Sequence, residues 1–80
     1  MSKLREAFKK IAGHDGRGYM ADAAEWLGCR QHTLNRWEAT GAIHDHYLWA
    51  LVHGAGAGFD VAGLLMELFD TRRRRALQDK

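Results

Sequence analysis

The sequence contains no proline, a single cysteine and no long apolar run. A lone cysteine, Cys29, cannot close a disulfide within the chain, which is typical of a reducing compartment such as the bacterial cytoplasm. No apolar segment approaches the roughly 20 residues needed to cross a bilayer, and the N-terminal residues lack a signal-peptide pattern. The formal net charge of +2 is too small to indicate a partner by itself. We therefore expect a small cytoplasmic protein that does not associate with membranes.

The pattern that is present is helical and punctuated by glycine. No segment alternates apolar and polar residues as a strand does, so the 80 residues predict one all-α domain, a compact five-helix bundle. The predicted helices cover residues 3–12, 19–27, 31–39, 45–53 and a segment from residue 60 onward. Ser2, Asp45 and Asp60 are the expected N-caps, Gly13 ends the first helix, and residues 54–58 form a flexible connection.

The break at Gly28 joins two predicted helices in the manner of a helix-turn-helix. Glycine readily adopts the positive φ that such a turn requires. Small and apolar residues lie around it at fixed offsets, on faces that can meet in one core. These motif positions are Ala24, Leu27, Gly28, Cys29, Leu34 and Trp37. The spacing predicts a helix-turn-helix between Met20 and Ala39.

The predicted helix after the turn carries a polar face opposite Leu34. At about 100° per residue, His32, Asn35, Arg36 and Ala39 project from this face, and Gln31 flanks it at the N-terminal end. The expected base-reading residues are Gln31, His32, Asn35 and Arg36. Gln and Asn make paired hydrogen bonds to adenine, and Arg does the same with guanine. Within this predicted helix, no acidic residue precedes Glu38. The alternative interpretation is an ordinary solvated face, but such a face more often alternates Glu and Lys.

The stretch from Ala23 to Glu38, AAEWLGCRQHTLNRWE, resembles the helix-turn-helix of Cro and phage-repressor (lambda repressor-like) domains, including small YdaS-like regulators. The resemblance implies a five-helix fold, a homodimer on a near-palindromic operator in double-stranded DNA, and transcriptional repression. By position, Gln31, His32 and Arg36 fall where that family reads bases, with Asn35 beside them.

Residues outside the reading face are expected to contact phosphates or a second subunit. The expected phosphate contacts are Arg30, Arg17, Thr33 and Thr40. Arg30 stands where the family often has a Ser or Thr as the N-cap. Loss of that cap costs about 1 kcal/mol of helix stability, which a phosphate contact from Arg30 can offset. A small monomer has too little interior for all the apolar residues of the last two helices. The expected dimer contacts are Trp49, Leu64, Leu65 and Leu68.

Other interpretations remain at this point. The run Arg72–Arg75 is either a solvated helix end or a set of phosphate contacts, and residues 60–80 serve dimerisation or phosphate binding. The histidines lack the spacing of a metal site, and no nucleotide-binding glycine loop is present. No catalytic base that could activate the Cys29 thiol is evident. We therefore expect no cofactor, no small-molecule substrate and no enzymatic activity. Alternative functions are an excisionase-like or MerR-like architectural DNA binder, or a protein-interaction module such as an antitoxin.

Overall fold

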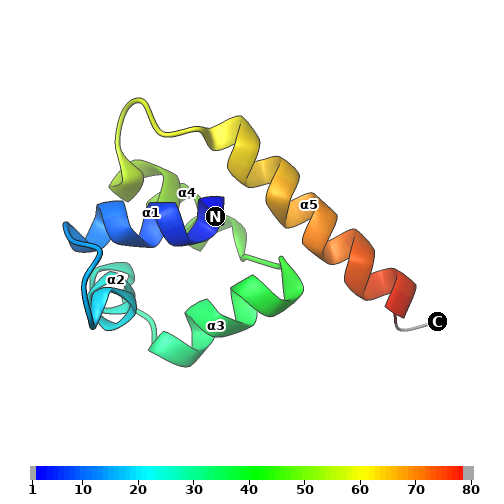
Figure 1. The fold of residues 1–80 in the computed structure, drawn as a ribbon, viewed down its shortest axis with the longest axis horizontal. Helices are drawn as coiled ribbons and strands as arrows, with labels where there is room; N and C mark the ends of the chain where they lie inside the picture. Colours follow the sequence, from blue (N-terminus) through cyan, green and yellow to red (C-terminus); the bar gives the residue numbers. More distant parts are fainter. Residues whose placement is uncertain (1, 79–80) are drawn as a thin grey trace.

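The computed structural model describes residues 2–78, which form five α-helices and no β-strand. The helices in chain order are α1 (Lys3–Ala12), α2 (Tyr19–Leu27), α3 (Gln31–Thr40), α4 (Asp45–Ala55) and α5 (Val61–Gln78), as Figure 1 shows. The predicted all-α, five-helix fold class is confirmed. The predicted bounds of α1 and α2 agree with the structure, while α3 and α4 extend slightly further than their patterns indicated.

Capping side chains explain where α1 and α5 begin. The Ser2 hydroxyl accepts a hydrogen bond from the Arg5 amide at 3.2 Å, and the Asp60 carboxylate accepts one from the Gly63 amide at 2.9 Å. Both predicted N-caps are therefore confirmed. The prediction for Asp45 is wrong, because Asp45 is the first residue of α4 and His44 is the capping position, without a side-chain hydrogen bond. A carboxylate in the first turn still favours the helix through its dipole.

The end of α4 departs from the predicted flexible connection because Gly54 is held by tertiary packing. A Cβ atom at Gly54 would lie 2.7 Å from the Trp26 ring and 2.8 Å from Ile11. Only glycine allows α1 and α2 to approach α4 this closely. The helix therefore continues through Gly54 to Ala55, and the connection to α5 is correspondingly shorter.

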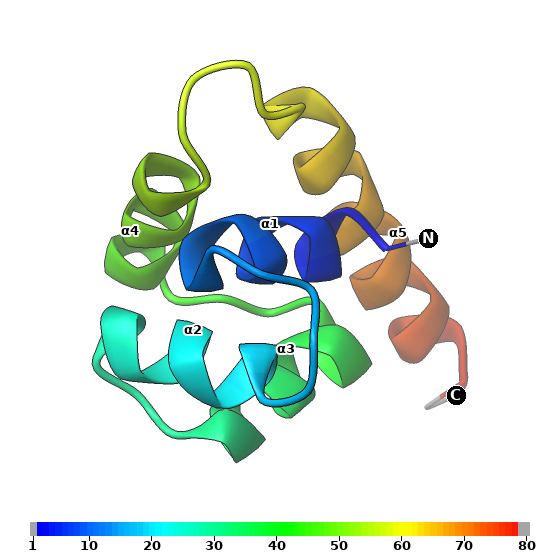
Figure 2. The same ribbon diagram turned by 60° about the vertical axis from the view of Figure 1, so that its left-hand side comes forward.

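The core lies around α1, which packs against α2, α4 and α5, while α3 packs against α2 and α5. Figure 2 shows α1 at the centre of this arrangement, with α4 and α5 on opposite sides of it. The largest fully buried side chains come from four different helices: Leu4, Phe8, Leu34, Leu51 and Leu64. A core this small depends on each of these residues.

The inner face of α5 contributes to the core of the monomer. Leu64 is 0% exposed and Leu68 is 4% exposed. The expectation that these two leucines contact a second subunit is therefore wrong, because their side chains are already covered by the chain's own helices. Of the expected dimer contacts, Trp49 and Leu65 remain exposed, at 77% and 46%. None of the described helices, α5 included, is both long and apolar enough to cross a bilayer.

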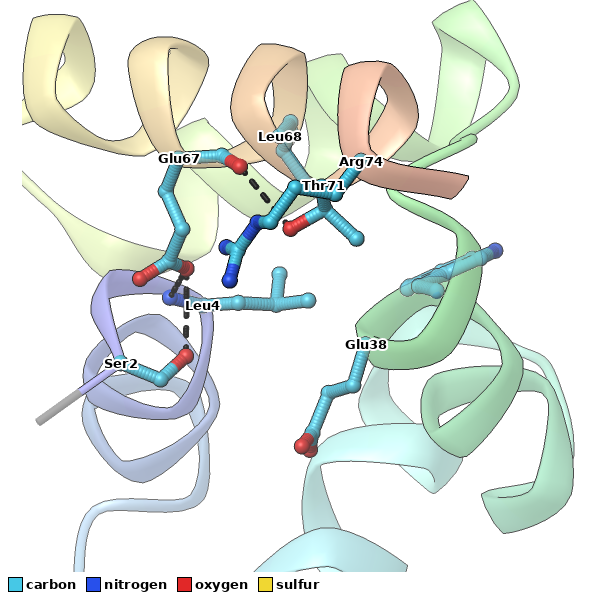
Figure 3. Close-up of a pocket in the computed structure, with 8 residues that line it drawn as sticks. Ser2, Leu4, Glu38, Glu67, Leu68, Thr71 and Arg74 are labelled. Carbon is cyan, nitrogen blue, oxygen red and sulfur yellow. Dashed lines mark hydrogen bonds between the residues drawn. The ribbon is translucent and has the colours of Figure 1, made fainter. Parts of the chain in front are cut away.

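A carboxylate near the middle of α5 fixes that helix to the beginning of α1. Glu67 accepts hydrogen bonds from the Lys3 amide at 2.8 Å, the Leu4 amide at 2.9 Å and the Ser2 hydroxyl at 3.1 Å. Figure 3 shows those from Leu4 and Ser2. The first amides of a helix have no partner within the helix, and a carboxylate complements the positive end of the helix dipole. Glu67 thereby sets the position of α5 relative to the rest of the bundle.

Candidate nucleic-acid interface

The turn between α2 and α3 is built on Gly28, whose φ is +77°. The Gly28 amide donates to the Glu25 carbonyl at 3.2 Å, and the Cys29 amide donates to the Ala24 carbonyl at 3.0 Å. This pair of hydrogen bonds is the Schellman motif, which requires a left-handed residue directly after the helix. The glycine thus ends α2 abruptly and lets the chain turn into α3, as the sequence predicts.

Buried side chains hold α3 from its inner face. Leu34 and Trp37 are 0% and 4% exposed. The Trp37 ring packs against Phe8 of α1 and Tyr47 of α4, with ring centroids 6.4 and 5.5 Å away. Aromatic packing from two sides fixes the rotation of a helix about its own axis. Ala24 and Leu27 of α2 lie in the same core, and Cys29 packs against it, whereas Gly28 is exposed in the turn.

The outer face of α3 carries the four predicted base-reading side chains. All four, Gln31, His32, Asn35 and Arg36, are exposed, as is the small Ala39 beside them. His32, Asn35, Arg36 and Ala39 lie on the side away from Leu34, and Gln31 flanks them at the beginning of the helix. The arrangement offers hydrogen-bond donors and acceptors on a rigid helix, with no bulky residue between them.

The nearest carboxylate, Glu38, is turned away from this face toward α1. Its Oε2 atom lies 3.0 Å from Nε of Arg5, while its Oε1 atom is buried without a hydrogen-bond partner. Hydrogen bonding to Glu38, together with its charge, raises the pKa of Arg5. The ion pair with Arg5 holds the Glu38 carboxylate away from the outer face of α3, where its negative charge would repel a polyanion.

The beginning of α3 has no side-chain cap, as the sequence predicts. Arg30 occupies the capping position with an extended backbone and makes no side-chain capping hydrogen bond. The Thr33 amide is satisfied by the Arg30 carbonyl at 3.0 Å, and the first turn contains no acidic residue. The positive end of the α3 dipole is therefore not neutralised by a side chain of this turn.

The four expected phosphate contacts differ in their exposure and in the hydrogen bonds that they already make within the protein. Arg17 and Arg30 are exposed in the connections that precede α2 and α3, and Thr33 is half-buried. The Thr40 hydroxyl donates to the Arg36 carbonyl at 2.9 Å and accepts from the Ala42 amide at 3.2 Å. Thr40 thus closes α3, as its position before Gly41 predicts, and its hydroxyl has no free proton to donate.

Cys29 and the histidines are the remaining groups with reactive or ligating side chains. Cys29 is half-buried against the core, and burial raises the pKa of its thiol, which disfavours the reactive thiolate. The Nδ1 atoms of His44 and His46 lie 3.1 Å apart. Within residues 2–78, no group of three or more His, Cys, Asp or Glu side chains is arranged to hold a metal ion.

A second surface lies between α4 and α5 and has the opposite character. It is a shallow groove of about 140 Å³ lined only by apolar side chains: Leu48, Trp49, Val52, Val61 and Leu65. Along α5 it is followed by exposed Phe69, 54% accessible. Large exposed apolar groups that lie next to one another are typical of a surface that contacts another protein.

No family model, curated protein or solved structure matches this chain. The chemistry of the two surfaces therefore has to be inferred from their own residues. The outer face of α3 combines amide side chains, an imidazole and a guanidinium on a helix about 10–12 Å wide. A helix of that width fits the major groove of B-DNA, which is about 12 Å wide.

Proposed function

We propose that this protein is a sequence-specific DNA-binding regulator that places α3 in the major groove. The observation that carries the proposal is the outer face of α3, where Gln31, His32, Asn35 and Arg36 are exposed together and no carboxylate lies among them. Leu34 and Trp37 hold this face rigidly. Base recognition requires such preorganised donors and acceptors, because a mobile side chain loses entropy when it binds.

Each part of the interface has a separate role in the proposal. Gln31 and Asn35 make paired hydrogen bonds to adenine, and Arg36 does so to guanine. Arg17, Arg30 and the uncapped start of α3 bind phosphates, which position the helix without reading sequence. The Gly28 turn and α2 hold α3 at the angle that the groove requires.

The proposal includes a homodimer in which the groove between α4 and α5 packs against its copy. A ten-residue helix contacts only a few base pairs, and a second copy doubles the number of contacts. An isologous dimer needs one self-complementary patch, and Trp49 and Leu65 supply large apolar groups at this surface. Two subunits would then read half-sites about 34 Å apart on a near-palindromic operator.

The test is selection of bound sequences from a random duplex library, followed by binding titrations on the selected site. We expect a near-palindromic consensus. Arg36→Ala should weaken binding to the selected duplex by about 5- to 150-fold, the equivalent of 1–3 kcal/mol for one base contact. It should also relax the preference at one base pair of each half-site, while the circular dichroism spectrum stays unchanged.

Lys10→Ala is the matched control, because it removes one exposed positive charge from α1. It should leave sequence preference unchanged. Failure to enrich any sequence would overturn the proposal, and an Arg36→Ala variant with unaltered preference would overturn the assignment of the reading face. Light scattering tests the dimer separately: Trp49→Gln should convert a dimer to a monomer, and a wild-type protein that is monomeric at micromolar concentration contradicts the dimer.

A protein-interaction module, such as an antitoxin, is the second candidate. Trp49 favours it, because an indole that is 77% exposed is an effective anchor for another protein. In that case Trp49→Gln would abolish function, whereas Arg36→Ala would not. Because Trp49→Gln would also weaken operator binding through loss of the dimer, Arg36→Ala is the variant that separates the two functions.

A further inference from the structure

The four consecutive arginines of α5 point to three different places. Arg72 and Arg75, three residues apart and so on one side of the helix, line a shallow hollow together with Arg36, Thr40 and Ala42. Arg73 lies on another side of the helix, at a surface shared with Asp70, Leu77 and part of Arg74. Helical geometry thus divides one run of like charges into groups with different surroundings.

Arg74 belongs to a third environment. It lines the cleft between α1, α3 and α5, together with Glu38 and Glu67. Figure 3 shows its side chain turned back toward Glu67 and the beginning of α1. Arg74 is therefore close to negative charge supplied by the protein. Arg75 also borders a neighbouring hollow that contains Glu38, but that carboxylate is already paired with Arg5.

The hollow exists because α5 packs directly on the end of α3. A Cβ atom at Gly41 would lie 2.5 Å from the Leu68 carbonyl and 3.1 Å from Cγ of Arg72. The absence of a side chain at Gly41, whose φ is +71°, lets the two helices meet backbone to backbone. The aliphatic part of Arg72 therefore lies on the turn that follows α3, and its charge is held next to α3.

The arginines of this hollow form no ion pair within the described residues. Arg36, Arg72 and Arg75 line it, and no carboxylate among residues 2–78 does. Like charges brought together on neighbouring elements repel one another and lower stability slightly. A fixed cluster of guanidinium groups favours an anionic partner, and guanidinium matches phosphate geometry well.

We propose that Arg72 and Arg75 form a clamp on the phosphate backbone of duplex DNA, next to the groove that α3 occupies. The inference rests on the proposed function and deepens it. From Gln31 to Thr40, α3 rises about 13 Å at 1.5 Å per residue, whereas the major groove is about 12 Å wide. The C-terminal end of a helix that reads bases with its first two turns therefore lies beside the sugar-phosphate backbone, where α5 brings the two arginines.

The test compares a double variant and a single variant within the run of four arginines. Arg72→Gln/Arg75→Gln removes the clamp, while Arg73→Gln removes an arginine from another side of α5; Gln keeps most of the aliphatic stem and a similar helix propensity. Binding to the selected operator and to a random-sequence duplex is measured by fluorescence anisotropy over a series of KCl concentrations. Melting temperatures are measured alongside, to compare folded proteins.

The double variant is expected to reduce the slope of log Kd against log salt by about two, because each phosphate that an arginine neutralises adds close to 0.9 to that slope. Between about 50 and 200 mM salt, wild-type affinity should consequently fall about tenfold more than that of the variant. The loss at low salt should be equal for operator and random duplex. Arg73→Gln should leave the slope unchanged.

The outcomes separate this inference from the proposed function. If wild type binds its operator and the double variant keeps the wild-type slope, the clamp is wrong and the proposed function stands. If Arg73→Gln reduces the slope by about half as much as the double variant, the effect is one of diffuse charge, and this result would also overturn the clamp. If wild type binds neither duplex at low salt, the proposed function fails and the clamp fails with it.

Discussion

Helices α3 and α5 both present a long exposed face, but they support it in different ways. In α3 the buried residues Leu34 and Trp37 lie beneath the whole exposed face. In α5 the buried residues Leu64 and Leu68 lie in the first half, and every residue from Arg72 to Gln78 is exposed. The comparison indicates that α3 is suited to precise recognition, whereas the end of α5 is suited to contacts that tolerate imprecision.

The chemistry of the two faces follows the same division. The face of α3 contains directional hydrogen-bonding groups, which require fixed positions. The face of α5 contains apolar residues near α4 and then arginines, whose contributions depend less on geometry. Substitutions that alter the support of each face test this division.

The largest effect is expected from emptying the buried side of α5. Leu64→Ala should lower the free energy of unfolding by about 2–5 kcal/mol, because it removes a fully buried side chain and leaves a cavity. Leu65→Ala, one residue later and 46% exposed, should change monomer stability by less than about 1 kcal/mol and weaken the proposed dimer instead. Urea denaturation measures the stability and light scattering measures the dimer. Equal destabilisation by Leu64→Ala and Leu65→Ala would contradict the division of α5 into inner and outer faces.

These two leucines also show how far the sequence predicts the structure. The stripe of apolar residues identifies α5 as an amphipathic helix, but two adjacent stripes, one with Leu64 and one with Leu65, are equally apolar. Which stripe faces inward depends on where α3 and α1 lie, and this is decided by tertiary contacts at Gly41 and Glu67. The helix-turn-helix was easier to predict, because Gly28, Leu34 and Trp37 are tied to one another by local spacing. By contrast, Glu67 caps a helix more than sixty residues earlier in the chain, and no local pattern records such a contact.

The second prediction breaks the joint between α3 and α5. Gly41→Ala should cost about 2–3 kcal/mol, because it combines an unfavourable left-handed backbone with a clash against the Leu68 carbonyl. Gly13→Ala is the matched control, since Gly13 has a φ of +81° and no atom within 4 Å of a built Cβ. It should cost only about 1 kcal/mol, the backbone term alone. Equal losses in urea denaturation would show that the close approach of α5 does not constrain Gly41.

A smaller effect is expected at the contact between α5 and α1. Glu67→Ala should lower stability by about 1–2 kcal/mol, because the first amides of α1 lose the carboxylate that accepts their hydrogen bonds. Hydrogen exchange should speed up at the Lys3 and Leu4 amides in particular. Glu25→Ala, an exposed residue of α2, should leave exchange at these amides unchanged; unaltered exchange in Glu67→Ala would show that Glu67 does not hold the two helices together.

The smallest effect concerns the beginning of α5 and depends on pH. The hydrogen bond from the Gly63 amide, assisted by Lys3, lowers the pKa of Asp60 below its ordinary value of 3.8. A carboxyl whose pKa is lower in the folded state contributes stability above its unfolded pKa and loses it as the pH falls through the folded pKa. The difference in melting temperature between wild type and Asp60→Ala should therefore be constant near neutral pH and close progressively below about pH 4. Asp60→Asn, which keeps a capping oxygen without a titrating charge, should retain part of the stability at every pH. If the advantage of wild type over Asp60→Ala persists unchanged to pH 2, the charge of Asp60 does not support the start of α5.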